Sequence, residues 1–397
     1  MTDDHQWHAP DAPRDPASSP YHAAPVASGG ASGSAPDAPA APAGANGWAP
    51  PPKPGLVPLR PMTLGTILGT SFQVLRRNPK PTLGPALLIS LATVLFTLFV
   101  TGGVTAWSIG RIESAQSDAD ADALLAGGVA LGVVGIVLAM LLSIIGTAVL
   151  QGIIVAEVAR ATLGEKLTFR GLWAHLRGRV GALIGWAFLL SAALMIALIV
   201  VVVVVAGLSL LGEVGIALGV LVAVLAVLGG AVLVAWLSTK FLFVPAALVL
   251  ERRTLGAAVA RSWTLIRGSF WRVFGIVLLV AVMLSIAGQV VTTPVSLLFG
   301  LGTTLIAPSG MDEAGFIAIT IVSYLVLFVV SAVVGAVTLV VQTATSSLLY
   351  LDLRFRTEGL DLELARAVEA RQRGEHLTDP YAARPPGSPA FGSPFAS

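Results

Sequence analysis

Six long apolar stretches constrain the fold of this chain more than any other feature. They cover residues 84–106, 124–155, 181–211, 214–245, 273–299 and 315–349. A helix needs roughly 20 apolar residues to cross the hydrocarbon core of a bilayer, and every stretch exceeds that length. Charged residues make up only 12% of the chain, about half the share found in soluble domains. We therefore predict an all-α integral membrane protein with six transmembrane helices.

The third and fourth stretches are separated only by Gly212 and Glu213. This short separation allows two interpretations, a very tight hairpin or a single long helix that is kinked at Gly212. About 60 apolar residues are too many for one crossing of a bilayer, which favours the hairpin.

Lysine and arginine lie almost entirely on one side of this six-span topology. Of the 24 such residues, all except Arg111 lie before the first span, around the second and fourth connecting loops, or after the sixth span. Loops rich in Lys and Arg remain in the cytoplasm. We therefore predict a plasma-membrane protein whose N- and C-termini are both cytoplasmic.

The two ends of the chain differ in composition from the apolar middle. Residues 1–56 and 377–397 are rich in Pro, Ala, Gly and Ser, a composition that cannot bury enough apolar surface to form a core. We predict that both are disordered cytoplasmic tails. The membrane domain is predicted over residues 57–350, and a cytoplasmic amphipathic helix over residues 351–376.

A short motif recurs before three of the spans. An aromatic residue is followed by an aliphatic residue at the third position, arginine at the fourth and glycine at the twelfth. The three copies are Phe72, Leu75, Arg76 and Gly84; Trp173, Leu176, Arg177 and Gly185; and Trp263, Ile266, Arg267 and Gly275. A Thr-Leu-Gly marker precedes them, at Thr63, Thr162 and Thr254. We predict three parallel repeats, about residues 60–160, 161–252 and 253–350, each an interfacial amphipathic helix followed by a transmembrane hairpin.

The residues of this motif suit a helix that lies in the membrane interface. Such a helix places its aromatic residue at headgroup depth and its arginine toward lipid phosphate, and the glycine lets the backbone turn or pack closely. Simple anchoring is the alternative to headgroup recognition. The predicted contacts with anionic lipid of the inner leaflet are Arg76, Arg77, Trp173, Arg177, Trp263, Arg267 and Arg272.

Polar residues recur at matching depths in the second, fourth and sixth spans. Aligning these spans superposes Thr147, Thr239 and Gln342, with Gln151 one turn further along and Lys240 as the clearest ionisable residue inside a span. Polar residues inside spans mark substrate routes in many membrane proteins. We predict an intramembrane polar layer of these five residues, and hydrogen bonds between packed helices are the alternative.

Three segments carry a resemblance to a known family. They are "PLRPMTLGTILGTSFQVLRRNPKPTLG", "FVPAALVLERRTLGAAVARSWTLIRGSFWRVFG" and "LYLDLRFRTEGLDLEL". Together they resemble an actinobacterial multi-pass family that is similar to the membrane domain of glycerophosphoryl diester phosphodiesterases. The resemblance covers about residues 56–370, and it implies the membrane domain without the catalytic barrel.

The sequence leaves more than one class of function open. It contains no cysteine and no His/Asp/Glu constellation within a span, so we predict no enzymatic activity, no metal or other cofactor and no nucleic-acid partner. We expect an accessory or scaffold protein that contacts anionic lipid. A protein partner would bind the tails or the apolar stripe of Leu360, Leu364 and Val368. A transporter or lipid translocator with a path between the three hairpins is the alternative.

Overall fold

The computed structural model describes residues 55–56, 60–112, 117–306, 313–375 and 379–382. The chain divides into two units, Met1–Pro51 and Pro52–Ser397, and all the described residues belong to the second. These residues form helices and no strand, and six of the helices are long and apolar enough to cross a membrane. The prediction of an all-α protein with six membrane-spanning helices is therefore confirmed.

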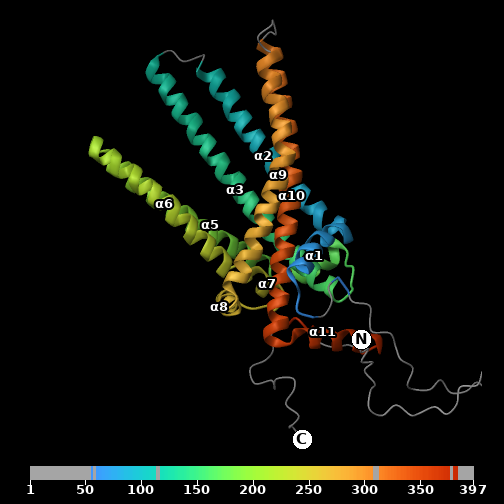
Figure 1. Ribbon diagram of the computed structural model, residues 1–397. Coiled ribbons are helices and arrows are strands. Elements are labelled where there is room, and N and C mark those ends of the chain that lie inside the picture. The colour runs from blue at the N-terminus through green and yellow to red at the C-terminus, as the bar shows by residue number, and fades with distance from the viewer. Residues whose placement is uncertain (1–54, 57–59, 113–116, 307–312, 376–378, 383–397) are drawn as a thin grey trace, which may run out of the picture. The chain divides into compact units, whose positions relative to one another are not determined.

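The six long helices pack as three hairpins. α2 packs along α3, α5 along α6 and α9 along α10, and α10 also packs against α2 and α3 (Figure 1). In the most apolar 18-residue segment of each span, at most 22% of the residues are buried. Most side chains of these segments therefore face outward, where lipid would surround them. Their bounds are Pro79–Ile112 (α2), Asp118–Thr162 (α3), Val180–Ser209 (α5), Glu213–Lys240 (α6), Phe270–Ile306 (α9) and Glu313–Glu358 (α10).

The turn between α5 and α6 depends on glycine. Gly212 has φ 80° and ψ −159°, a backbone conformation that is open essentially only to glycine. A Cβ on Gly215 would lie 2.0 Å from the carbonyl oxygen of Leu208, so the second helix can begin beside the first only if this position has no side chain. The predicted hairpin is confirmed, and the alternative of one kinked helix is wrong.

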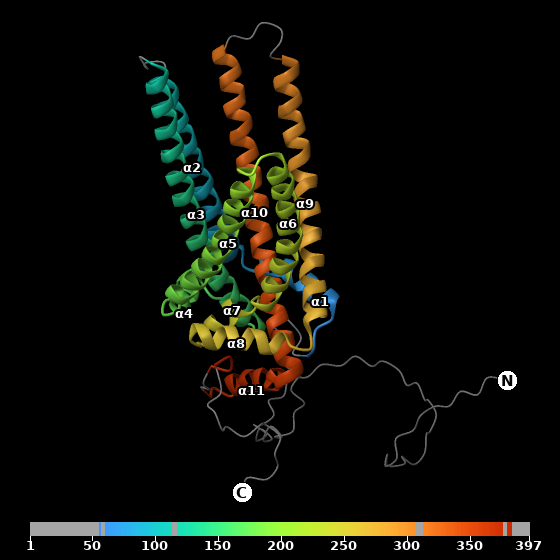
Figure 2. The same cartoon turned by 90° about the vertical axis from the view of Figure 1, so that its left-hand side faces the viewer.

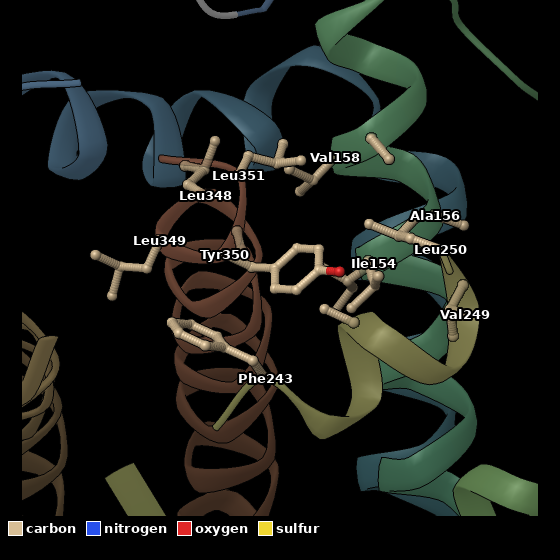
Figure 3. Packing of buried hydrophobic residues seen from close by; sticks show 14 of the residues in the cluster. Ile154, Ala156, Val158, Phe243, Val249, Leu250, Leu348, Leu349, Tyr350 and Leu351 are labelled. Carbon is tan, nitrogen blue, oxygen red and sulfur yellow. The ribbon is translucent and has the colours of Figure 1, made fainter. Parts of the chain in front are cut away.

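Five shorter helices gather at one end of the hairpins, which we call the base (Figure 2). Most of the buried apolar residues lie there, and Figure 3 shows Tyr350 of α10 reaching toward Ile154 of α3 beside Phe243. Three of the short helices, α1, α4 and α8, each precede one hairpin; the parallel symmetry of these units stays a prediction. The short helices are Leu64–Arg77 (α1), Phe169–Leu176 (α4), Val244–Val249 (α7), Leu255–Ile266 (α8) and Leu360–Gln372 (α11).

Threonine begins each helix that precedes a hairpin. Thr63, Thr168 and Thr254 are the N-cap residues of α1, α4 and α8, a position that favours threonine. In the first and third units, this cap is the threonine of the Thr-Leu-Gly marker. In the middle unit, the marker's Thr162 is the last residue of α3 and Thr168 provides the cap instead. The marker therefore stands at a different distance from its aromatic residue there.

The glycines at the twelfth position of the motif do not have the role predicted for them. Gly84, Gly185 and Gly275 lie inside α2, α5 and α9, and a Cβ on any of them would meet open space. The prediction that they turn the backbone or allow close packing is wrong, because the spans begin several residues earlier. Between α8 and α9 the backbone turns at Gly268, which has φ 98°.

The segment after the sixth span packs onto the base. α10 continues to Glu358, and α11 begins after Gly359, which has φ 65°. Leu360 and Leu364 of the predicted partner-binding stripe are buried in the protein's own core, and Val368 packs against it. The apolar stripe is therefore covered by this chain rather than presented to a partner.

Part of the C-terminal stretch predicted as a disordered tail is docked. Tyr381 is buried, and its hydroxyl donates a hydrogen bond to the carbonyl oxygen of Ala159 at 2.7 Å. Asp379 forms an ion pair with Arg160 at 2.7 Å. These contacts hold residues 379–382 against the end of α3.

Candidate functional site: a cavity between the hairpins

A cavity of about 460 Å³ lies where the three hairpins meet above the base. Residues of α3, α5, α9 and α10 line it, together with the end of α6, the α6–α7 connection and the start of α7. Hydroxyl and amide side chains on these helices alternate with apolar ones. Among the described residues, no charged side chain lines the cavity. The lining can therefore donate and accept hydrogen bonds while it also contacts hydrocarbon.

The predicted polar layer is brought together only in part. Thr147 and Gln151 of α3 and Gln342 of α10 line the same cavity. Thr239 lies outside the lining; it is 3% exposed, and its hydroxyl donates a hydrogen bond to the carbonyl of Ala235 at 2.8 Å. Lys240 also lies outside the lining.

The ammonium group of Lys240 is directed at aromatic rings. Its Nζ lies 5.0 Å from the ring centroid of Trp263 and 5.6 Å from that of Phe270. Trp263 also packs edge-on against Trp236, with 5.5 Å between ring centroids. A cation over an aromatic face is stabilised by the ring quadrupole. The only ionisable member of the predicted layer is therefore held at this aromatic cluster, outside the cavity lining.

Two amide side chains in the lining have no hydrogen-bond partner. Gln342 is exposed and Gln151 is half-buried, and neither amide is bonded to any residue that the structure describes. Thr345 and Ser346 differ, because their hydroxyls donate to the carbonyls of Val341 at 2.8 Å and Thr343 at 2.9 Å. An amide without a partner in an apolar medium costs about 2–7 kcal/mol. Surrounded by bilayer hydrocarbon, the two amides would need water or a polar ligand.

Five of the seven residues predicted to contact lipid headgroups are exposed at the base. They are Arg76, Trp173, Arg177, Trp263 and Arg267. The three arginines occupy the same position of the recurring motif, but Arg76 lies within α1, whereas Arg177 and Arg267 are the C-cap residues of α4 and α8.

The other two predicted headgroup residues are bonded within the protein. Arg77 donates to the carbonyls of Ala161 at 3.0 Å and Glu165 at 3.2 Å. Arg272 pairs with Asp352 at 2.9 Å and donates to the carbonyl of Met62 at 3.1 Å. Both arginines therefore hold the base together instead of extending freely toward lipid.

Sequence analysis missed a buried acidic residue in the base. The carboxylate of Glu251 accepts hydrogen bonds from the Tyr350 hydroxyl and from the guanidinium groups of Arg253 and Arg261, the last at 2.8 Å. Burial alone raises the pKa of Glu251. The positive charge of Arg354, the Tyr350 hydrogen bond and the contacts with Arg261 and Arg253 outweigh burial and lower the pKa below its usual value of 4.5. Glu251 is therefore ionised at neutral pH.

A second buried acid, Asp352, connects three distant segments. It accepts a hydrogen bond from the backbone N–H of Met62 at 2.7 Å, and it pairs with Arg272 and Arg356 at 2.9 and 3.1 Å. Met62 and Asp352 are 290 residues apart in the sequence. No local pattern in the sequence marks such a pair.

The described residues contain no group of three or more His, Cys, Asp or Glu that could hold a metal ion. The cavity between the hairpins is the candidate ligand site. A family profile described as a domain of unknown function, DUF7847, matches residues 62–353. No curated protein and no solved structure matches the chain. The matched residues include the entire cavity lining and most of the base, and the chain therefore belongs to the DUF7847 family.

Proposed function

We propose that this multi-pass membrane protein is a non-enzymatic transporter or lipid translocator that binds an amphipathic molecule in the cavity between the hairpins. The observation that carries the proposal is the pair of unpartnered amides, Gln151 and Gln342, in one cavity at the depth of the spans. Helix packing alone would have paired these amides with each other or with the backbone. A bound polar group or water satisfies them.

The distribution of aromatic and basic residues supports a membrane boundary at the base. Trp173, Trp263 and Trp271 are exposed there, and tryptophan concentrates at the interface between bilayer and water. The exposed arginines lie at the same end. We propose on this basis that the base faces the cytoplasm and that the protein resides in the plasma membrane.

Single-cysteine variants test whether water reaches the cavity. The chain has no cysteine, so each variant carries one thiol without background. In membranes, Thr147→Cys and Gln342→Cys should react with a membrane-impermeant maleimide on the order of tenfold faster than Val203→Cys, because the reactive thiolate forms only where water is present. Val203 is 63% exposed on α5, where it faces lipid. Equal, slow labelling at all three positions would contradict an open cavity.

A second candidate function is an accessory or scaffold protein held at anionic lipid. The exposed arginines Arg76, Arg177 and Arg267, each one turn after an exposed aromatic residue, favour it. A protein partner that binds the tails stays a prediction of this candidate, and residues 1–54 and 383–397 lie outside the described part of the chain.

Replacing Arg76, Arg177 and Arg267 together with Gln should reduce the enrichment of phosphatidylglycerol over phosphatidylcholine around the reconstituted protein. Each basic residue near an anionic leaflet contributes about 1 kcal/mol, so the loss should be severalfold. This enrichment is measured as the ratio of the two lipids that stays bound after gentle extraction from an equimolar mixture of phosphatidylglycerol and phosphatidylcholine. Arg111→Gln, at the far end of α2 from the base, is the control and should have no such effect. If the triple variant retains the wild-type lipid ratio, this candidate fails.

A further inference from the structure

We infer that the polar part of the ligand in this cavity is uncharged, a hydroxyl-, ester- or amide-bearing head of a neutral amphiphile. The inference rests on the proposed function and adds the chemical class of the ligand. Its main evidence is the lining, in which every polar side chain is a serine, threonine, glutamine or tryptophan.

The lining offers both donors and acceptors of hydrogen bonds. Each unpartnered glutamine amide has one acceptor oxygen and two donor hydrogens. Ser143, Thr147 and Ser191 also line the cavity, and no described residue bonds their hydroxyls. A ligand hydroxyl needs such a mixed environment, since it donates one hydrogen bond and accepts others. A phosphate, which only accepts, would leave the glutamine carbonyl oxygens without donors.

Nearby positive charges are engaged elsewhere. Lys240 is directed at Trp263 and Phe270, and in the base Arg261 and Arg354 are paired with Glu251 and Glu358. An anionic headgroup inside the cavity would therefore lose its hydration without gaining a counter-charge, which is strongly unfavourable in a low-dielectric site. Anionic headgroups are better accommodated outside the cavity, beside the exposed arginines of the base.

The size and the apolar part of the cavity fit the head of a lipid and the first carbons of its chains. A volume of about 460 Å³ lies within the usual range for small-molecule sites. Leu190, Val277 and Leu339 contribute apolar walls. Beside them on α5 and α9, Leu189 and Leu278 are exposed to the outside of the bundle. Acyl chains would therefore leave the cavity along the apolar helix surfaces and enter the bilayer.

Photolabelling of the full-length protein in vesicles tests this inference. The probe is a diacylglycerol analogue with a photoreactive group near the head, and labelled peptides are identified by mass spectrometry. We expect labelling within residues 143–155 or 339–346, and we expect unlabelled dioleoylglycerol to compete at least tenfold better than phosphatidylglycerol. Gln151→Leu/Gln342→Leu should lose most of the labelling. Thr239→Val, whose hydroxyl bonds the backbone outside the cavity, should retain it.

The outcomes separate the two proposals. If phosphatidylglycerol competes as well as or better than dioleoylglycerol for the same peptides, the ligand is not restricted to neutral heads and the inference fails, while the proposed function stands. If neither lipid competes, or the labelled peptides lie elsewhere, the ligand-binding cavity itself is wrong. The competition uses the wild-type protein, so both conclusions hold even if the glutamine variants do not fold.

Discussion

Replacing Glu251 with Gln should destabilise the protein by about 3–5 kcal/mol, because it removes a buried carboxylate and leaves Arg261 and Arg354 to share that of Glu358. The side chain of Glu251 is 1% exposed, and those of its partners Arg261 and Arg354 are 18 and 7% exposed. The substitution keeps the size of the side chain but brings an amide N–H₂ against guanidinium groups that can only donate. The midpoint of thermal unfolding in nanodiscs should fall by roughly 5–10 °C.

Glu375→Gln is the matched control for this substitution. Glu375 also pairs with an arginine, Arg373 at 3.6 Å, but both side chains are more than half exposed. Surface pairs of this kind contribute about 0–1 kcal/mol, so the control should unfold close to the wild-type temperature. If the two variants unfold at the same temperature, Glu251 does not stabilise the base in the way described.

Glu251 should also make stability depend on pH. Because its pKa is lower in the folded protein than the usual 4.5, its contribution is complete above about pH 4.5 and is lost as the pH falls through the lower folded-state pKa. Below pH 4.5 the wild-type unfolding temperature should therefore fall more steeply than that of Glu251→Gln. If the unfolding temperatures of the two proteins fall in parallel with pH, the Glu251 carboxyl does not cause the pH dependence of stability.

The spans and the Gly212 hairpin were predictable because their signals are local. Hydropathy over 20 residues identifies a span, and two non-hydrophobic residues between apolar stretches identify a turn. The polar layer was predictable for Thr147, Gln151 and Gln342, since α3 and α10 continue well past these residues and keep the same face toward the cavity. The alignment failed at Thr239 and Lys240, because α6 ends at Lys240 and the chain turns into α7.

The charged contacts of the base could not be predicted in the same way. Glu251 and Tyr350 are 99 residues apart, and Asp352 bonds a residue 290 positions before it. Counting arginines predicts which side of the membrane a loop faces but not which arginines are free, because pairing depends on how the hairpins pack. Arg267 and Arg272 both lie between Trp263 and Gly275 of the third motif copy, yet the first is exposed and the second is bound to Asp352.

Replacing Asp352 with Asn should release the start of α1 from the base. Asp352 is fully buried and accepts the backbone N–H of Met62 together with two arginines, Arg272 and Arg356, which both also donate to the carbonyl of Met62. The arginines are 36 and 39% exposed and can regain water, so we expect a loss of about 2–3 kcal/mol, below that for Glu251. Amide hydrogen exchange in peptides that cover Met62 and the first turn of α1 should accelerate by roughly tenfold or more, since local opening controls exchange.

Asp361→Asn is the matched control, and it shows why the effect should be local. Asp361 lies in the first turn of α11, where its charge interacts with the helix dipole for about 0.3–1 kcal/mol. It should leave exchange at Met62 unchanged. Because Asp352 joins the end of α10 to the start of α9 and to the segment before α1, its loss should loosen the first and third units at the base but not α5 and α6. Exchange that rises equally in α5 and α6 would indicate general unfolding. It would contradict the idea that Asp352 specifically joins the first and third units.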